Sequence, residues 1–448
     1  MKPSIRSHPL RLRIEMNNST FCGSEPSWAN ASVGGNGCTS YVEYSKGFSM
    51  AANLLIDRVI AHQGKDYSLD DMIYPACFNM RHSVELHLKG SIEELQKIAE
   101  IKNIRLPFDL QGSHDIEKIW IFFQDESEKI DKRYIDINKK IGPTIKDIAE
   151  VDPTGQTFRY AVDKESKIHL DDVGLINFFI LKKKFSELEG DLDFLHMMNT
   201  YLLEEYRQGS FTANISRLEL FQMARKLPPT KNWRDGSSFN MIKDGLKDSY
   251  NLSSTELSKA IGIIKNHYEI SPVIGGIPNL QGVTEEQIIL YLDEWIKLNE
   301  EVKYRSEAPI EYSGIDFGKV FEGINAANKI IYESTCSLYN ELTPEFIAGI
   351  NSLFIFSPRS DFFSERYITT YEYELNNATT YRNKSISTFI DRFDKLNLLE
   401  NILKSLFFLN YSSVADLIIE RYEVSNSFLW IEAAKSRSLF EKPSYCGY

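Results

Sequence analysis

The sequence has few of the features that mark secreted, membrane or metal-binding proteins. Its five cysteines are scattered over 448 residues without a CxxC pair, which argues against a zinc ribbon and suits reduced cytosolic thiols. No apolar core of a secretory signal is found near the N-terminus. The longest apolar runs, such as LINFFIL, are too short to cross a bilayer. We therefore expect a cytoplasmic protein with no membrane segment.

The common catalytic and nucleotide-binding motifs are also missing. The sequence has no Walker loop, no GxGxxG and no nucleophile elbow, and VIGGIPN has two glycines but no lysine. The formal net charge of −12 disfavours non-specific coating of nucleic acid, although a local basic pocket could still admit RNA. We expect no cofactor and no bound metal.

Helical hydrophobic periodicity dominates the rest of the chain. With 42% hydrophobic and 25% charged residues, it has an ordinary globular composition. We predict an all-α protein, with a small β-hairpin where two alternating runs flank DKES. The expected parts are a flexible arm over 1–40, a helical bundle over 41–208 with the hairpin near 157–170, a small helical module over 209–282, and a C-terminal helical domain over 283–448.

One predicted helix carries an unusual set of charged residues. It covers residues 69–100, and Gly90 is expected to mark its end or a break in it. Its segment FNMRHSVELHLKG places an arginine, two histidines and a glutamate among apolar residues. Charged groups are rarely buried without partners, so this helix has either a solvated face or a functional site.

This helix and the segments after it resemble the HEPN superfamily. Its nuclease signature is an arginine followed by a polar residue and, a few residues later, a histidine; here Arg81, His82 and His87 match it, with five residues between Arg81 and His87. The chain is also similar, over about 41–285, to bacterial HEPN-like proteins with RHxxEL, HDLxKLW and FRYxxD segments. Further matching positions are Asp152-Pro153, Phe158-Arg159-Tyr160, Asp163, Ile215-Ser216-Arg217 and Leu227-Pro228-Pro229.

The resemblance implies a metal-independent endoribonuclease, in bacterial stress response or phage defence. Such enzymes act as homodimers or larger homo-oligomers, and a ribose 2′-OH of the RNA attacks the adjacent phosphate. His87 would transfer protons, because imidazole titrates near neutral pH. Arg81 would hold phosphate oxygens, and His82 would be the supporting polar position.

The same residues also have structural interpretations. Arg81 and His87 lie roughly 120° apart around a helix, whereas Glu85 lies one turn after Arg81 and could form an ion pair with it. Arg81, His82 and Glu85 could thus organise the bundle, which leaves His87 as the discriminating residue. His114 either supports the site or orders the start of its own helix.

Two further groups have alternative roles. Lys182, Lys183 and Lys184 are a candidate RNA-backbone contact or a solvated helix face. The polar residues around the predicted hairpin could bind a ligand, or an Asp–Arg pair could hold the hairpin; they are Asp152, Arg159, Tyr160 and Asp163.

Three hypotheses follow. The first is the HEPN-type endoribonuclease. The second is a non-catalytic HEPN-like protein that mediates interactions or senses a ligand. In the third, the N-terminal bundle cuts RNA while 283–448 senses or represses, through a regulatory protein or a ligand bound there.

Overall fold

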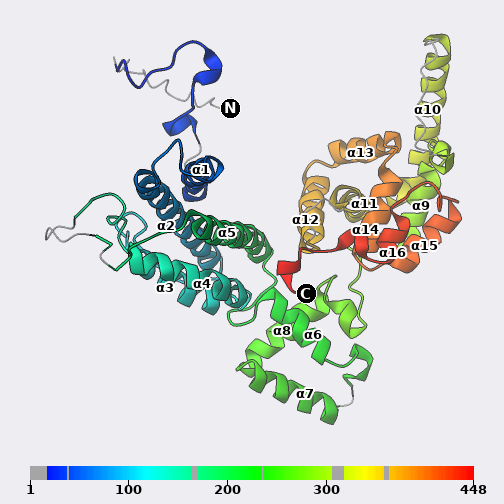
Figure 1. Ribbon diagram of the computed structural model, residues 1–448. Helices are drawn as coiled ribbons and strands as arrows, with labels where there is room; N and C mark the ends of the chain where they lie inside the picture. The colour runs from blue at the N-terminus through cyan, green and yellow to red at the C-terminus, as the bar shows by residue number, and fades with distance from the viewer. Residues whose placement is uncertain are drawn as a thin grey trace, which may run out of the picture. The chain divides into compact units, whose positions relative to one another are not determined.

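The computed structural model of the protein describes residues 18–37, 40–162, 169–170, 172–234, 236–304, 317–357 and 363–448 (Figure 1). These residues form sixteen α-helices and nine short 3-10 helices, and they contain no β-strand. The all-α prediction is therefore confirmed. Within the same ranges, no helix has both the length and the apolar character needed to span a bilayer.

The sixteen α-helices follow one another along the chain, with the longest connection between α4 and α5. Their bounds are α1 Tyr41–Ala61, α2 Leu69–Ile101, α3 Ile116–Ile130, α4 Tyr134–Val151, α5 Phe178–Arg207, α6 Arg217–Lys226, α7 Gly236–Ser249, α8 Ser254–Asn266, α9 Glu285–Trp295, α10 Phe317–Leu338, α11 Pro344–Phe356, α12 Glu365–Thr380, α13 Arg382–Ile390, α14 Leu398–Phe408, α15 Ser412–Arg421 and α16 Ile431–Lys435.

The chain divides into two compact units that interleave in sequence. Unit 1 comprises Met1–Gly90, Leu110–Trp120 and Thr144–Glu187, and unit 2 comprises Ser91–Asp109, Ile121–Pro143 and Leu188–Tyr448. Unit 1 contains the first part of α2, with Arg81, His82 and His87, whereas the rest of α2 from Ser91 belongs to unit 2. The division of the chain at 208 and 282 stays a prediction, as does the flexible arm.

Helix α2 does not end or break at Gly90, contrary to our expectation. It runs without interruption from Leu69 to Ile101. A Cβ atom at Gly90 would lie 2.6 Å from Cγ2 of Val42 and 3.4 Å from Cβ of Tyr41, both on α1. Glycine is therefore needed here for the close approach of two helices rather than for a turn.

The predicted hairpin is not confirmed. Residues 157–159, which should have begun its first strand, form a turn. The Asp152 carboxylate accepts a hydrogen bond from Thr157 N at 3.1 Å, and Gly155 turns the chain with φ of 77°. His169 N donates to Ala161 O at 3.3 Å. Residues 163–168, including Asp163, lie outside the described residues.

Two hydrophobic cores lie in the described part of unit 2 after residue 210. The smaller one is built by residues between Ile215 and Ile274, with Leu220, Met223 and Ala260 fully buried. The larger one draws on residues from Tyr268 to Phe440. The smaller core coincides with the middle part of the chain that periodicity marked as a helical module.

Replacing Gly90 with alanine tests the close helix contact. Alanine normally stabilises a helix interior relative to glycine by about 1 kcal/mol. At Gly90 the added methyl group must instead displace α1, so we expect a loss of roughly 1–3 kcal/mol, seen as a lower thermal midpoint. Gly47→Ala on α1 is the control, because no atom lies within 4 Å of its added Cβ and the variant should be neutral or more stable. An equal rise in the thermal midpoint of both variants would contradict a close contact between α1 and α2 at Gly90.

Candidate functional site

Arg81 lies inside unit 1 and is only 1% exposed. Its Nε donates to Asp152 O at 3.1 Å, and one terminal nitrogen donates to His114 O at 2.6 Å and Pro153 O at 2.8 Å. The other terminal nitrogen forms an ion pair with Glu85. One guanidinium thus fixes the loop before α3 and the loop after α4 against α2.

The loop after α4 is shaped around this guanidinium. A Cβ atom at Gly155 would lie 3.1 Å from a terminal nitrogen of Arg81, and the positive φ of Gly155 favours glycine independently. Pro153 O also accepts a hydrogen bond from Ile116 N at 2.9 Å, in the first turn of α3. The two loops are therefore joined to each other as well as to Arg81.

Glu85 is the shared anion of the cluster and is 2% exposed. Besides Arg81, it meets Lys89 Nζ at 2.9 Å and His114 Nδ1 at 3.0 Å. Burial opposes ionisation of this carboxyl, but Lys89, Arg81 and His114 together outweigh burial and hold the pKa of Glu85 below its usual value. The carboxylate balances charges on its own helix and on the loop before α3.

His114 is the accessible member of this cluster, with 62% of its side chain exposed. Its carbonyl binds Arg81 while its ring binds Glu85. Both interactions hold the segment that leads into α3, as the structural interpretation of His114 required. The ring is also positioned to meet solvent or a ligand.

His82 and His87 lie outside this ion-pair cluster. The His82 ring stacks on Phe78, with centroids 5.8 Å apart, and meets Phe48 edge to face at 4.4 Å. Burial lowers the pKa of His82. His87 is 5% exposed, and its Nδ1 lies 3.5 Å from Ser45 Oγ on α1. The contacts of Arg81 and His87 are thus on different sides of α2.

The three lysines of α5 differ in their surroundings. Lys182 Nζ bonds Asn53 Oδ1 at 2.8 Å and Asp57 Oδ1 at 3.0 Å on α1. Lys183 and Lys184 are exposed, and Lys183 lies 4.0 Å from Glu187. Lys182 therefore links α5 to α1, and the other two lie on a solvated face.

Three of the four polar residues around the predicted hairpin are described, and each contacts a different set of partners. The backbone carbonyl of Asp152 accepts a hydrogen bond from Arg81, and its carboxylate accepts one from Thr157 N. Arg159 lies over the rings of Phe78 and Tyr160, 5.6 and 5.4 Å from their centroids. Arg159 thus makes cation–π contacts. The Asp–Arg pair stays a prediction, because Asp163 lies outside the described residues.

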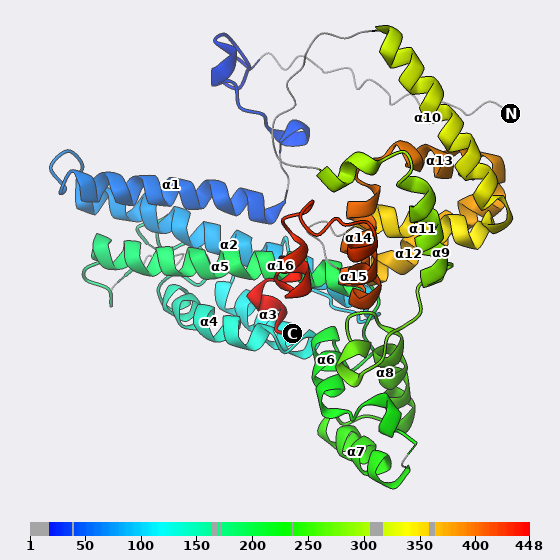
Figure 2. The ribbon, with the colours of Figure 1, turned by 90° about the vertical axis from the view of Figure 1, so that its right-hand side faces the viewer.

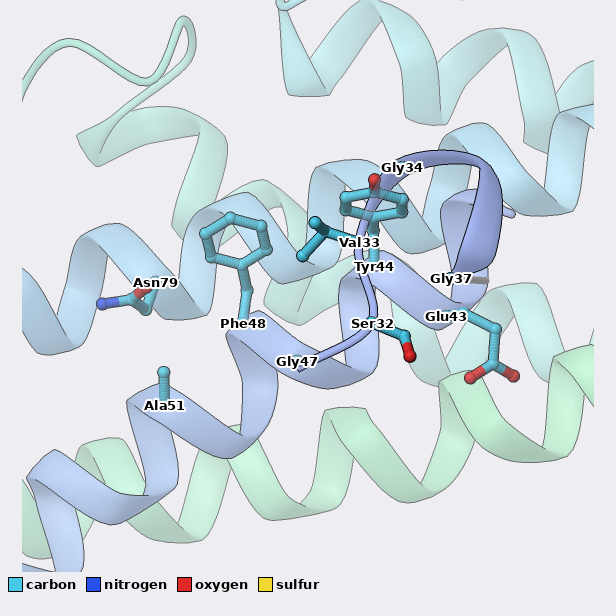
Figure 3. Close-up of a pocket in the computed structure, with 10 residues that line it drawn as sticks. All are labelled: Ser32, Val33, Gly34, Gly37, Glu43, Tyr44, Gly47, Phe48, Ala51 and Asn79. Carbon is cyan, nitrogen blue, oxygen red and sulfur yellow. The ribbon is translucent and has the colours of Figure 1, made fainter. Parts of the chain in front are cut away.

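A pocket of about 500 Å³ lies beside α1 and α2 in the same unit (Figure 3). Tyr44 and Phe48, one turn apart on α1, form its apolar wall with Val33. Phe48 also packs against His82, which connects the pocket to the motif helix. The remaining lining residues are Ser32, Gly34, Gly37, Glu43, Gly47, Ala51 and Asn79.

Sequence reasoning missed this pocket because we treated residues 1–40 only as a flexible arm. Two signals were available in retrospect. Tyr44 and Phe48 have the spacing that places aromatic rings on one helix face, and Gly34 and Gly37 lie in the segment that closes the pocket.

Three residues of unit 2 are close enough together to bind a metal, but their carboxylates already form ion pairs with basic side chains of the same unit. Ligand atoms of His267, Glu269 and Glu365 lie within 4.8 Å of one another. However, Arg217 forms ion pairs with both carboxylates, and Lys442 forms one with Glu269. Because a metal would have to displace the buried Arg217, this group is better described as an ion-pair network.

Comparison with known proteins adds no constraint on this site. No family model matches the sequence, and no curated protein or solved structure gives a significant match to it. Its assignment therefore rests on the geometry described above.

Glu85→Gln tests the charge balance of the cluster. The lowered pKa of Glu85 means that its ionised form stabilises the fold above its usual value of 4.5, and that this contribution fades as the pH falls through the lowered pKa. The variant should melt at a lower temperature than the wild type near pH 7, and this difference in thermal midpoint should shrink as the pH falls below 4.5. Glu117→Gln, at an exposed position on α3, should show no such difference. A difference in thermal midpoint between Glu85→Gln and the wild type that does not change with pH would contradict a stabilising role of the ionised Glu85.

Proposed function

We propose that this chain is a HEPN-like helical protein that works by recognising a ligand, with its motif residues serving to hold the fold together. The single observation that carries the proposal is the complete burial of Arg81 among acceptors of its own chain. The motif helix is then a scaffold, and recognition takes place beside it.

A phosphate clamp requires a guanidinium that RNA can reach. Arg81 directs four hydrogen bonds or ion-pair contacts to Asp152, His114, Pro153 and Glu85. Moving it to a phosphate would leave Glu85 and three carbonyls without this donor in a buried site, at a cost of several kcal/mol. This argues for a structural role of the arginine.

A second copy of the chain does not remove this difficulty. A dimer interface covers residues that are exposed in each separate chain, but Arg81 and His87 are 1% and 5% exposed within a single chain. A composite site would require α1 and two loops to move away from α2. The burial therefore favours the non-catalytic alternative.

The pocket beside α1 is the proposed place of recognition. Its volume of about 500 Å³ is within the range of small-molecule sites, which combine apolar walls with a few polar groups. Tyr44 and Phe48 offer ring faces, and Ser32, Glu43 and Asn79 offer polar groups. This combination suits a flat heteroaromatic ring with hydrogen-bonding edges, so we propose a nucleobase-containing ligand.

The four common ribonucleosides, each added in excess to the full chain, test this proposal. We expect at least one to raise the thermal midpoint in proportion to its concentration, because a ligand that binds the folded state stabilises it. Phe48→Ala should abolish the shift, whereas Tyr74→Ala, at an exposed aromatic on α2 outside the pocket lining, should retain it. No shift with any nucleoside, or an equal shift in both variants, would contradict a nucleobase site here.

The endoribonuclease is the second candidate, and the Arg81-His82…His87 spacing favours it. It would act on RNA as a homodimer, with His87 as the proton carrier. Incubation of total RNA with the protein in EDTA, in parallel with His87→Ala, distinguishes the two candidates. Cleavage that His87→Ala abolishes would establish the nuclease and displace the ligand-recognition proposal. A regulatory role for residues 283–448 also stays a prediction.

A further inference from the structure

Helices α6, α7 and α8 form a small three-helix arrangement within unit 2. Figure 2 shows α6 and α8 side by side, with α7 at their far end, as does Figure 1. Leu246 of α7, together with Leu220 of α6 and Ala260 of α8, belongs to one buried core. These three helices thus share one hydrophobic core. Their outward-facing side chains are not needed for that core and can contact a partner.

The connection from α7 to α8 is a tight, well-defined turn of four residues, 250–253. Asn251 adopts φ of 49°, and Leu252 N donates to Lys247 O at 2.9 Å, which ends α7 in a left-handed cap. Leu252 is 4% exposed. Ser253 and Glu256 then form a reciprocal capping box that starts α8. Two helices joined by a turn of this length have the connectivity of a helix–turn–helix unit.

The two faces of α8 differ sharply. Leu257, Ala260 and Ile264 are buried in the core. The residues of α8 that are classed as exposed have hydroxyl, amide and ammonium groups, and Glu256 is the partly exposed carboxylate of this helix; the exposed residues are Ser254, Thr255, Ser258, Lys259, Lys265 and Asn266. Side chains of this kind donate to phosphates and to base edges.

The module is also basic in an acidic protein. Residues 215–274 contain nine lysines and arginines and six aspartates and glutamates, whereas the whole chain has a net charge of −12. Glu256, on α8 itself, is used by the capping box and by Asn214. The local excess of positive charge favours a polyanionic partner.

The outward face of α8 is accessible within unit 2. A groove of about 700 Å³ lies beside it, and residues after α2 and before α6 form its other wall; the lining residues are Lys259, Gly262, Ile263 and Asn266 of α8 with Lys102, Asn103, Phe211, Thr212 and Ala213. Lys259 is exposed, and its charge acts on the Glu256 carboxylate three residues earlier without forming a close ion pair among the described residues. The lysine is therefore available to a partner.

We propose that α8 is a recognition helix that enters the major groove of double-stranded DNA. Lys259 would contact a phosphate, whereas Lys265 lies over the Trp233 ring, 5.6 Å from its centroid. The hydroxyl side chains near the N-terminus of α8 would face base edges, as in helix–turn–helix proteins; they are Ser254, Thr255 and Ser258. The major groove of B-form DNA admits an α-helix, whereas that of A-form RNA is too deep and narrow. This inference does not depend on the ligand pocket.

Fluorescence anisotropy of a labelled DNA duplex with the full chain tests the proposal. The affinity should fall as salt rises, and Lys259→Ala should weaken binding about fivefold and reduce the salt slope by about 1, because one phosphate contact is lost. Lys384→Ala on α13, another exposed lysine, is the matched control and should bind like the wild type.

A second variant separates base readout from charge. After selection of preferred duplexes from a random pool, Thr255→Val should reduce the preference for the selected sequence at least threefold and leave the salt slope unchanged. Circular dichroism would establish that each variant is folded. Absence of duplex binding, an equal loss in Lys384→Ala, or tighter binding to double-stranded or single-stranded RNA would overturn the proposal.

Discussion

The buried ion pair between Arg81 and Glu85 is the interaction on which the architecture of unit 1 depends. Two charges inside a protein are tolerated only when nearly every donor and acceptor is satisfied. Here three backbone carbonyls accept hydrogen bonds from Arg81, and Lys89 forms a second ion pair with Glu85. The three carbonyls belong to loops that are distant from α2 in sequence. The pair therefore dictates where the chain must pass before α3 and after α4.

This constraint changes the meaning of the HEPN-like motif. A guanidinium that is fully used inside the fold cannot also receive a phosphate, and the adjacent histidines have neighbours of different chemistry, aromatic for His82 and hydroxyl for His87. The features suited to partners lie elsewhere: a pocket beside α1 in unit 1 and the polar face of α8 in unit 2. We therefore propose a protein that recognises a small ligand and DNA on a helical scaffold.

The sequence predicted well what depends on local periodicity and poorly what depends on distant contacts. The helices follow from apolar spacing, and the Arg81–Glu85 pair follows from their separation by one turn. Gly90 misled us because its close neighbour, Val42, lies 48 positions earlier in the chain. The turn at residues 157–159, where we expected a strand to begin, depends on the contacts of Asp152 with Thr157 and of Gly155 with Arg81. Burial of His87 against Ser45 likewise could not be deduced from the motif alone.

Hydrogen exchange of the backbone amides in residues 113–116 and 152–157 is the most direct test of the central claim, comparing the wild type with Arg81→Ala. If Arg81 holds both loops, its loss should destabilise them by about 3–5 kcal/mol, and both segments should exchange much faster, while Arg421→Ala, at an exposed ion pair with Asp293, leaves them unchanged. Unaltered protection of the two loops in Arg81→Ala would contradict the account and return the arginine to the list of candidate catalytic residues.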